Sequence, residues 1–173
     1  MAFNFVVETG EADPDANSYT TVEYADDYSE ANTFQSAAWL NLEEEDKQRL
    51  LVRSSKQLDV RFTWNGRRVD QDSGLKWPRT GVYDEDGFQI ADDVIPRILQ
   101  DATVEFAMYL MNDDWTAPRT EDQFKEIQVD VIDLKFNTDY ARPYVPPTIQ
   151  TMLQSLGDCI TGGRVGFKKI KRT

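Results

Sequence analysis

A chain of 173 residues that is 40% hydrophobic is long enough to bury the core of one domain and too apolar to be wholly disordered. It has a formal net charge of −12 and no histidine, which excludes imidazole-based catalysis and the commonest transition-metal ligand. Its single cysteine, Cys159, excludes an internal disulfide framework. We therefore expect no enzyme and no cofactor. No run is long and apolar enough for a membrane span, and no secretory signal is visible.

The basic residues are concentrated at one end. Residues 161–173 hold five bases and no acid, so residues 1–160 carry the other fourteen bases, all thirty-one acids and a formal charge of −17. Such a body opposes binding to duplex DNA, which requires Lys and Arg against the phosphates. Charge and composition divide the chain into an acidic N-terminal lead (1–17), a main domain (18–160) and a basic arm (161–173). The arm contains Arg164, Phe167, Lys168, Lys169, Ile170, Lys171 and Arg172.

Two short helical elements are predicted first. Thr20 and Glu23 have the spacing of a capping box, which predicts a helix to about Ala31. Its inner face should hold Val22, Ala25 and either Tyr28 or Tyr24. Residues 37–40 then predict a turn or a single helical coil that places Trp39 in the core.

Two long helices follow. The first is predicted from Leu42 to Phe62, with Asn41 as its N-cap and Asn65-Gly66 ending it. Its apolar face should hold Leu51, Ser54 or Ser55, Leu58 and Phe62. The second should begin near Val94, with Asp93 as its N-cap and Pro96 in its first turn. Its predicted buried set is Ile95, Leu99, Ala102, Phe106 and Leu110, with Tyr109 beside it.

The last third of the domain contains a β signal and a short helix. Near-alternation of apolar residues over 127–136 predicts a strand or hairpin with one irregular step at Ile132. Three prolines precede a predicted last helix from Thr148 to Leu156, which Gly157 should end. The fold class is therefore mainly α, a bundle of about four helices with a long structured loop, a small β element and an extended C-terminal arm.

Three possible reactive sites have weak support. Residues 84–87 read Asp-Glu-Asp-Gly, but in a calcium loop with Gly87 at position six, position one would be Val82, which cannot bind the ion. A solvated tight turn is the better interpretation. Among the thirty-one acids no carboxylate pair stands out for acid–base or magnesium chemistry. Without an imidazole to activate it, Cys159, which should follow the last helix, is expected to be inert.

The segment from Trp64 to Ile90 is the main candidate site. Two tryptophans, a proline and four glycines indicate a structured loop anchored by aromatic residues. Pro78 should hold Trp77 extended and leave Arg79 free to pair with acids. A rigid scaffold or subunit contact is the favoured role, and catalysis or base stacking is the alternative. The candidate residues are Trp64, Gly66, Arg67, Trp77, Pro78, Arg79, Gly81, Asp84, Asp86 and Gly87.

Several motifs coincide with those of a known family. They are Ser18-Tyr19 with Val22, Ala25, Asp26 and Tyr28, then Trp39, Leu58-Asp59, Trp64 to Arg68, Leu75 to Gly81, Asp84 to Ile90 and Val94-Ile95-Pro96. On these residues the chain resembles tailed-phage proteins that carry a DnaT-like single-stranded-DNA-binding label and look like head–tail adaptors, also called connector or head-completion proteins. The resemblance is close over Ser18 to Leu110 and looser beyond. The Trp-Pro-Arg-x-Gly and Asp-x-Asp-Gly combination is its most specific part.

The resemblance implies a structural virion protein of the phage neck. Such a subunit assembles as a ring, usually twelve-fold, beneath the portal of the DNA-filled head, and its C-terminal segment embraces the portal. The partners would be the portal protein, neighbouring copies and a downstream tail or nozzle protein, with genomic DNA passing as cargo. Localisation would be the virion head–tail junction, after assembly in the host bacterial cytoplasm.

Charge agrees with this expectation at two points. An acidic ring offers passing DNA few cations, and a basic arm containing Phe167 and Ile170 suits a cleft on an acidic partner. The alternative is a single-stranded-DNA-binding module with a basic groove and stacking aromatics, for which the candidates are Trp64, Arg67, Arg68, Trp77 and Arg79. The formal charge of −17 on residues 1–160 opposes single-stranded-DNA binding. A carboxylate-based, metal-dependent hydrolase is a third and weaker hypothesis.

Overall fold

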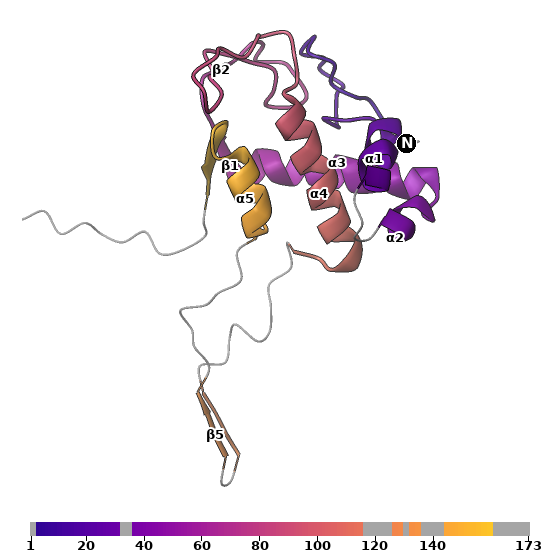
Figure 1. The fold of residues 1–173 in the computed structure, drawn as a ribbon, viewed down its shortest axis with the longest axis vertical. Helices are drawn as coiled ribbons and strands as arrows, with labels where there is room; N and C mark the ends of the chain where they lie inside the picture. The colour runs from indigo at the N-terminus through magenta and orange to yellow at the C-terminus, as the bar shows by residue number, and fades with distance from the viewer. Residues whose placement is uncertain (1–2, 32–35, 116–125, 130–131, 136–143, 161–173) are drawn as a thin grey trace, which may run out of the picture.

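The computed structural model of the chain describes residues 3–31, 36–115, 126–129, 132–135 and 144–160. The basic arm, residues 161–173, lies outside the described residues, and so do all seven of its candidate side chains. In the described part, helix α3 (Glu44–Arg61) lies across helix α4 (Arg97–Asn112), and the other helices pack around this crossing (Figure 1). The mainly α fold with a small β element is confirmed.

Helix α1 (Val22–Ala31) and the short helix α2 (Ser36–Leu40) lie where the sequence predicted them. Trp39 is fully buried, and Ala25 with the partly buried Val22, Tyr24 and Tyr28 packs in the same cluster, as expected. The predicted N-cap is wrong by one residue. The hydroxyl of Thr21 accepts the hydrogen bond from the Tyr24 amide at 3.0 Å. Thr20, one position earlier, is buried, and its hydroxyl makes no hydrogen bond to the described residues.

Helix α3 is shorter than predicted at both ends. It begins after Glu43 rather than Asn41, and no side chain caps it. It ends at Arg61, because residues Phe62–Trp64 form strand β1, which pairs with strand β6 (Gly157–Cys159). A pairing between residues so far apart in the chain overrides the helical periodicity that extended to Phe62. The predicted inner face is confirmed for Leu51, Ser54, Ser55 and Leu58.

Helix α4 begins three residues later than expected. Pro96, rather than Asp93, stands at the N-cap position, in an extended conformation with φ −56° and ψ 137°. A proline disfavours the helical conformation of the residue before it, so Ile95 cannot belong to the helix. The predicted buried set is confirmed throughout: Ile95, Leu99, Ala102, Phe106 and Leu110 are buried, and Tyr109 is partly buried.

The C-terminal elements differ from the prediction in one respect. Helix α5 (Pro147–Leu153) begins one residue earlier and ends three residues earlier than expected, and Gly157 begins β6 instead of ending the helix. Cys159 therefore lies in a strand and not at the end of the helix. The hairpin alternative for residues 127–136 is confirmed, because β4 (Glu126–Val129) pairs antiparallel with β5 (Ile132–Lys135).

The core consists of two packed groups. The larger joins α3, α4, α5 and the loop after β1, and the smaller joins α1, α2, α3 and α4 around Trp39. Two residue pairs form a further antiparallel ladder between β2 (Arg67–Arg68) and β3 (Arg79–Thr80) within that loop. Within the described ranges no helix is both long and apolar enough to cross a membrane.

Candidate functional site

The candidate loop is held against the core by its two tryptophans. Trp64 and Trp77 are both buried and meet edge to face, with ring centroids 6.0 Å apart. Trp64 also stacks on Phe62, with ring centroids 5.0 Å apart. Pro78 follows Trp77 through a cis peptide bond, which the sequence did not predict. Aromatic pairs of this kind add to the energy of burial, so the loop is an integral part of the domain.

The side chain of Asp59 joins the loop to α3 and to the N-terminal segment. Its Oδ1 accepts hydrogen bonds from the Tyr19 hydroxyl at 2.6 Å and from the Trp64 indole at 3.0 Å. Its Oδ2 accepts from the backbone amide of Lys76 at 2.9 Å. Three segments that are distant in sequence therefore converge on one buried carboxyl group.

Burial sets the protonation behaviour of this group. Desolvation is the largest effect and raises the pKa of Asp59 above its ordinary value, while the hydrogen bonds from Tyr19, Lys76 and Trp64 act in the opposite direction. Desolvation, followed by the charge of Asp59, raises the pKa of Tyr19 well above its ordinary value. The Tyr19 hydroxyl also accepts from the amides of Lys76 at 3.2 Å and Trp77 at 3.3 Å. The Tyr19 hydroxyl thus donates one hydrogen bond and accepts two, and all three hold the loop.

Arg79 is buried, contrary to the expectation that it would be free to pair with acids. Only 8% of the residue is exposed, and burial lowers the pKa of its guanidinium. The side chain donates to four backbone carbonyls, those of Asn65 at 2.6 Å, Gly66 at 2.8 Å, Lys76 at 3.0 Å and Trp64 at 3.5 Å. Among the described residues it forms no salt bridge. Arg79 therefore fixes the backbone on both sides of the loop.

The other basic residues of the loop are placed differently. Arg67 and Arg68 are both exposed, and Arg68 donates to the carbonyls of Leu75, at 3.0 Å, and Ser73. Gly66 has a φ of +67°, and a Cβ there would lie 2.3 Å from the carbonyl oxygen of Thr80. Only glycine fits that position. The exposed Gly81 turns the chain after β3.

Residues 84–88 form the predicted tight turn. The Asp84 carboxylate accepts from the amides of Asp86 at 3.0 Å and Phe88 at 2.8 Å, and Gly87 has the positive φ, +85°, that the turn requires. The acids face solvent. In the part of the chain that the structure describes, no three metal-ligating side chains lie together. The tip exposes two aromatic residues, Phe88 and Tyr83.

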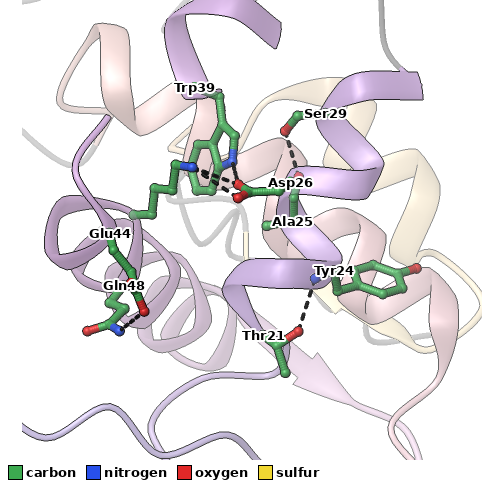
Figure 2. Close-up of polar contacts among 9 residues, drawn as sticks. Thr21, Tyr24, Ala25, Asp26, Ser29, Trp39, Glu44 and Gln48 are labelled. Atoms are coloured by element: carbon green, nitrogen blue, oxygen red, sulfur yellow. Dashed lines mark hydrogen bonds and ion pairs between the residues drawn. The ribbon is translucent and has the colours of Figure 1, made fainter. Parts of the chain in front are cut away.

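A second polar cluster, which the sequence reading did not pick out as a site, surrounds Asp26 (Figure 2). Asp26 accepts from the Trp39 indole at 2.8 Å and from the Lys47 ammonium at 2.9 and 3.0 Å. One aspartate thus joins α1, α2 and α3. Asp26 and Trp39 both belong to the motifs shared with the known family, so the sequence did mark these two residues. No motif marked Lys47.

Two tyrosines of α1 reach α4 in a similar way. The hydroxyl of Tyr24 donates to Asp101 at 2.5 Å and that of Tyr28 donates to Glu105 at 2.9 Å. Desolvation, then the hydrogen bond to the carboxylate, raises the pKa of each phenol. The Tyr-x-x-x-Tyr spacing places the two contacts one turn apart on α1.

We expect a measurable coupling within the Asp26 cluster. In a double-mutant cycle of Asp26→Asn and Lys47→Met, the interaction free energy should be about 1–2 kcal/mol, because Lys47 is buried and Asp26 half-buried. The ion pair between Glu45 and Arg49 is the matched control, since both side chains are more than half exposed. Its coupling should be about 0.3–0.5 kcal/mol. Equal couplings in urea unfolding would contradict the structural role of Asp26.

The only cysteine offers no reactive site. Cys159 is half-buried in β6, and desolvation raises the pKa of its thiol while the charge of Arg61 has a smaller opposing effect. A raised pKa disfavours the thiolate, which is the reactive form. This agrees with the prediction of an inert thiol.

These contacts decide what the loop can do. A groove that stacks bases needs exposed aromatic rings and free cations. Five residues were predicted for such a groove. Trp64, Trp77 and Arg79 are buried, and the exposed Arg68 is bound to backbone carbonyls. Only Arg67 is both exposed and without a bond of this kind to the described residues. The four other side chains are therefore engaged in packing and in hydrogen bonds within the loop.

A sequence model of the family described as "Putative DnaT-like ssDNA binding protein" matches residues 3–173. The match covers the N-terminal lead, the helical domain and the basic arm, and so extends beyond the motifs between Ser18 and Leu110. No curated protein and no solved structure matches the chain. The comparisons name no head–tail adaptor, and that part of the resemblance stays a prediction.

Proposed function

The chain belongs to this DnaT-like family, and from that premise we propose that it is a structural subunit of the head–tail junction of a tailed phage. In this role it binds the portal, forms a ring with copies of itself and lines part of the DNA exit channel above a downstream tail protein. The observation that carries the proposal is the burial of Trp64, Trp77 and Arg79, which assigns the motif loop to packing.

The negative charge of residues 1–160 supports a role as the wall of a DNA channel rather than as a DNA-binding surface. Residues 1–160 carry −17, and the loop arginine that sequence reasoning left free is bound to carbonyls. A channel wall of this charge repels phosphates and offers few cations for DNA to hold. DNA would pass such a ring without adhering to it.

The basic arm, residues 161–173, is the proposed portal contact. Five bases can steer it to an acidic cleft, and Phe167 and Ile170 can anchor it there. We expect that deleting residues 163–173 leaves the thermal unfolding of the domain unchanged and weakens co-sedimentation with rings of the same phage's portal protein about tenfold or more.

Two full-length variants serve as controls for that deletion. Replacing the five bases of the arm by glutamine should make portal binding weaker and insensitive to salt. Replacing Phe167 and Ile170 by serine should weaken it while the salt dependence remains. Portal binding that survives the deletion would remove the arm from the interface.

Single-stranded-DNA binding is the second candidate, and the family description is the observation that favours it. Since Trp39, Trp64 and Trp77 are buried and Trp115 is partly buried, we expect this activity to depend on the arm, where Phe167 lies among five bases. A labelled oligonucleotide of about 20 nucleotides, mixed with the full chain at low salt, separates the candidates. The adaptor proposal expects no shift. Micromolar, salt-sensitive binding that is lost with the arm would support the second candidate instead.

A further inference from the structure

Arg61, the last residue of α3, is a partly buried base whose charge no described acid neutralises. Its guanidinium carbon lies 4.1 Å from the centroid of the Tyr144 ring, within the range of a cation–π contact. The guanidinium makes no hydrogen bond or ion pair with the described residues, and its Nε is buried without an acceptor. A buried donor without an acceptor costs free energy, so this group favours an added oxygen ligand.

The other bases with described side chains are either bonded or exposed. Besides Arg61, only Lys56 and Arg67 make no hydrogen bond or ion pair with a described residue. Both are exposed, where water solvates the charge. Arg61 is held by an aromatic ring and partly shielded from water. A carboxylate would therefore bind Arg61 more strongly than either exposed base.

The acidic turn, Tyr83 to Phe88, presents free carboxylates between two exposed aromatic rings. Asp84 is used within the turn, where its carboxylate accepts from two backbone amides. Glu85 and Asp86 are exposed and pair with no described base. Phe88 is 71% exposed and Tyr83 54% exposed. The Asp84 amide also donates to the Phe88 carbonyl at 2.9 Å, so the turn is fixed before it binds and loses little conformational entropy.

The acidic turn and Arg61 are placed for a contact between two copies of the chain. Arg61 precedes β1, and the loop that carries the turn follows β1 and lies beyond the end of the β1–β6 sheet in Figure 1. No hydrogen bond or ion pair joins the turn to Arg61 among the described residues of one copy. Opposite charges at these two places would fix the orientation in which two otherwise acidic copies meet.

We infer that the acidic turn of one copy docks on Arg61 of a second copy, where the Glu85 carboxylate pairs with the guanidinium and Phe88 packs beside Tyr144. Glu85 has the longest acidic side chain of the turn, and its carboxylate supplies the acceptor that Arg61 lacks. The contact joins two different surfaces, so it is heterologous, and repetition closes a ring or continues as a filament. The inference deepens the proposed function and rests on it only for ring closure.

Four variants of the full chain test the contact by sedimentation velocity at low salt. Arg61→Glu disables the docking site, with Lys56→Glu, at an exposed base of the same helix, as its control. Glu85→Lys disables the turn, with Asp92→Lys, at an exposed acid that follows the turn, as its control. The wild-type chain and both controls should associate into dimers and larger species, and each disabling variant should associate about tenfold or more weakly.

A charge swap gives the decisive result. A chain that carries both Arg61→Glu and Glu85→Lys exchanges the two charges, so it should associate more strongly than either single variant. Because it contains both substitutions, better folding cannot explain the regained association. Three results overturn the inference: a wild-type chain that stays monomeric at about 1 mM protein, a swapped chain that associates no better than the single variants, or a control that acts like its disabling variant.

Portal co-sedimentation of the same variants tests the proposed function separately. Arm-dependent portal binding can persist in a chain whose copies do not associate, so the two proposals can fail independently.

Discussion

Replacing Asp59 by alanine is expected to lower the free energy of unfolding by about 3–5 kcal/mol, the largest effect of any single substitution outside the apolar core. The substitution leaves the Tyr19 hydroxyl and the Trp64 indole without their acceptor in a buried site, and it leaves the Lys76 amide with only its longer bond to the Tyr19 oxygen. Each unsatisfied buried donor costs about 1–3 kcal/mol. Urea unfolding monitored by tryptophan fluorescence measures the change.

Two further substitutions define the origin of that loss. Tyr19→Phe removes one donor to Asp59 and the acceptor of the Trp77 amide, and it should cost about 1–3 kcal/mol, less than Asp59→Ala. Asp27→Ala, at an exposed acid of α1, should change stability by less than about 0.5 kcal/mol. If Asp59→Ala were as mild as Asp27→Ala, the carboxyl group would not hold the loop.

The pH dependence of this variant has a definite sign. Because burial raises the pKa of Asp59, the folded protein keeps this proton to a higher pH than the unfolded chain does. The contribution of Asp59 to the free energy of unfolding is therefore most favourable below its ordinary pKa of 3.8, and it is lost as pH rises through the pKa in the folded protein. The stability difference between wild type and Asp59→Ala should be larger at the acidic end of that window. A difference that grows with rising pH would mean that the hydrogen bonds, rather than desolvation, dominate.

Replacing Arg79 by lysine is expected to cost about 2–4 kcal/mol, although the charge is kept. The guanidinium donates to the carbonyls of residues 64, 65, 66 and 76, and an ammonium group cannot reach all four. One of the carbonyls that lose their donor belongs to the buried Trp64. Thermal unfolding should show the loss, and limited proteolysis should show cleavage within residues 65–76.

The neighbouring Arg67 is the matched control for this substitution. It lies in the same small ladder but faces solvent, so Arg67→Lys should change stability by less than about 0.5 kcal/mol. A similar loss in both variants would indicate that charge, and not the hydrogen-bond geometry of the guanidinium, determines the stability of the loop.

The helices of this fold were largely predictable because each has an apolar stripe at helical spacing. The errors lie at helix ends, where distant residues decide. Phe62 continues the stripe of α3, yet it belongs to β1 because Cys159, at the other end of the domain, pairs with it. The start of α4 could have been placed better, since the restriction that Pro96 imposes on Ile95 is local and readable from the sequence.

The candidate site was predictable in its location but not in its use. The tryptophans and glycines marked the loop correctly. Whether Arg79 faces acids or carbonyls depends on the path of the backbone around it. The residue types in the loop do not reveal that path. Asp59 appeared in the family-like motifs only as a neighbour of Leu58, and its role depends on Tyr19 and Lys76, which approach it from either side in sequence.

The pairing of β1 with β6 also bears on the order of events during synthesis. Phe62 meets Cys159, 97 positions later in the chain, so the aromatic strand stays without its partner while those residues are added. At about 5–20 residues per second this takes about 5–20 seconds. During that interval Phe62 and Trp64 are available to chaperones and to other nascent chains. Slow translation upstream of residue 157 should therefore lower the yield of folded protein more than slow translation after it.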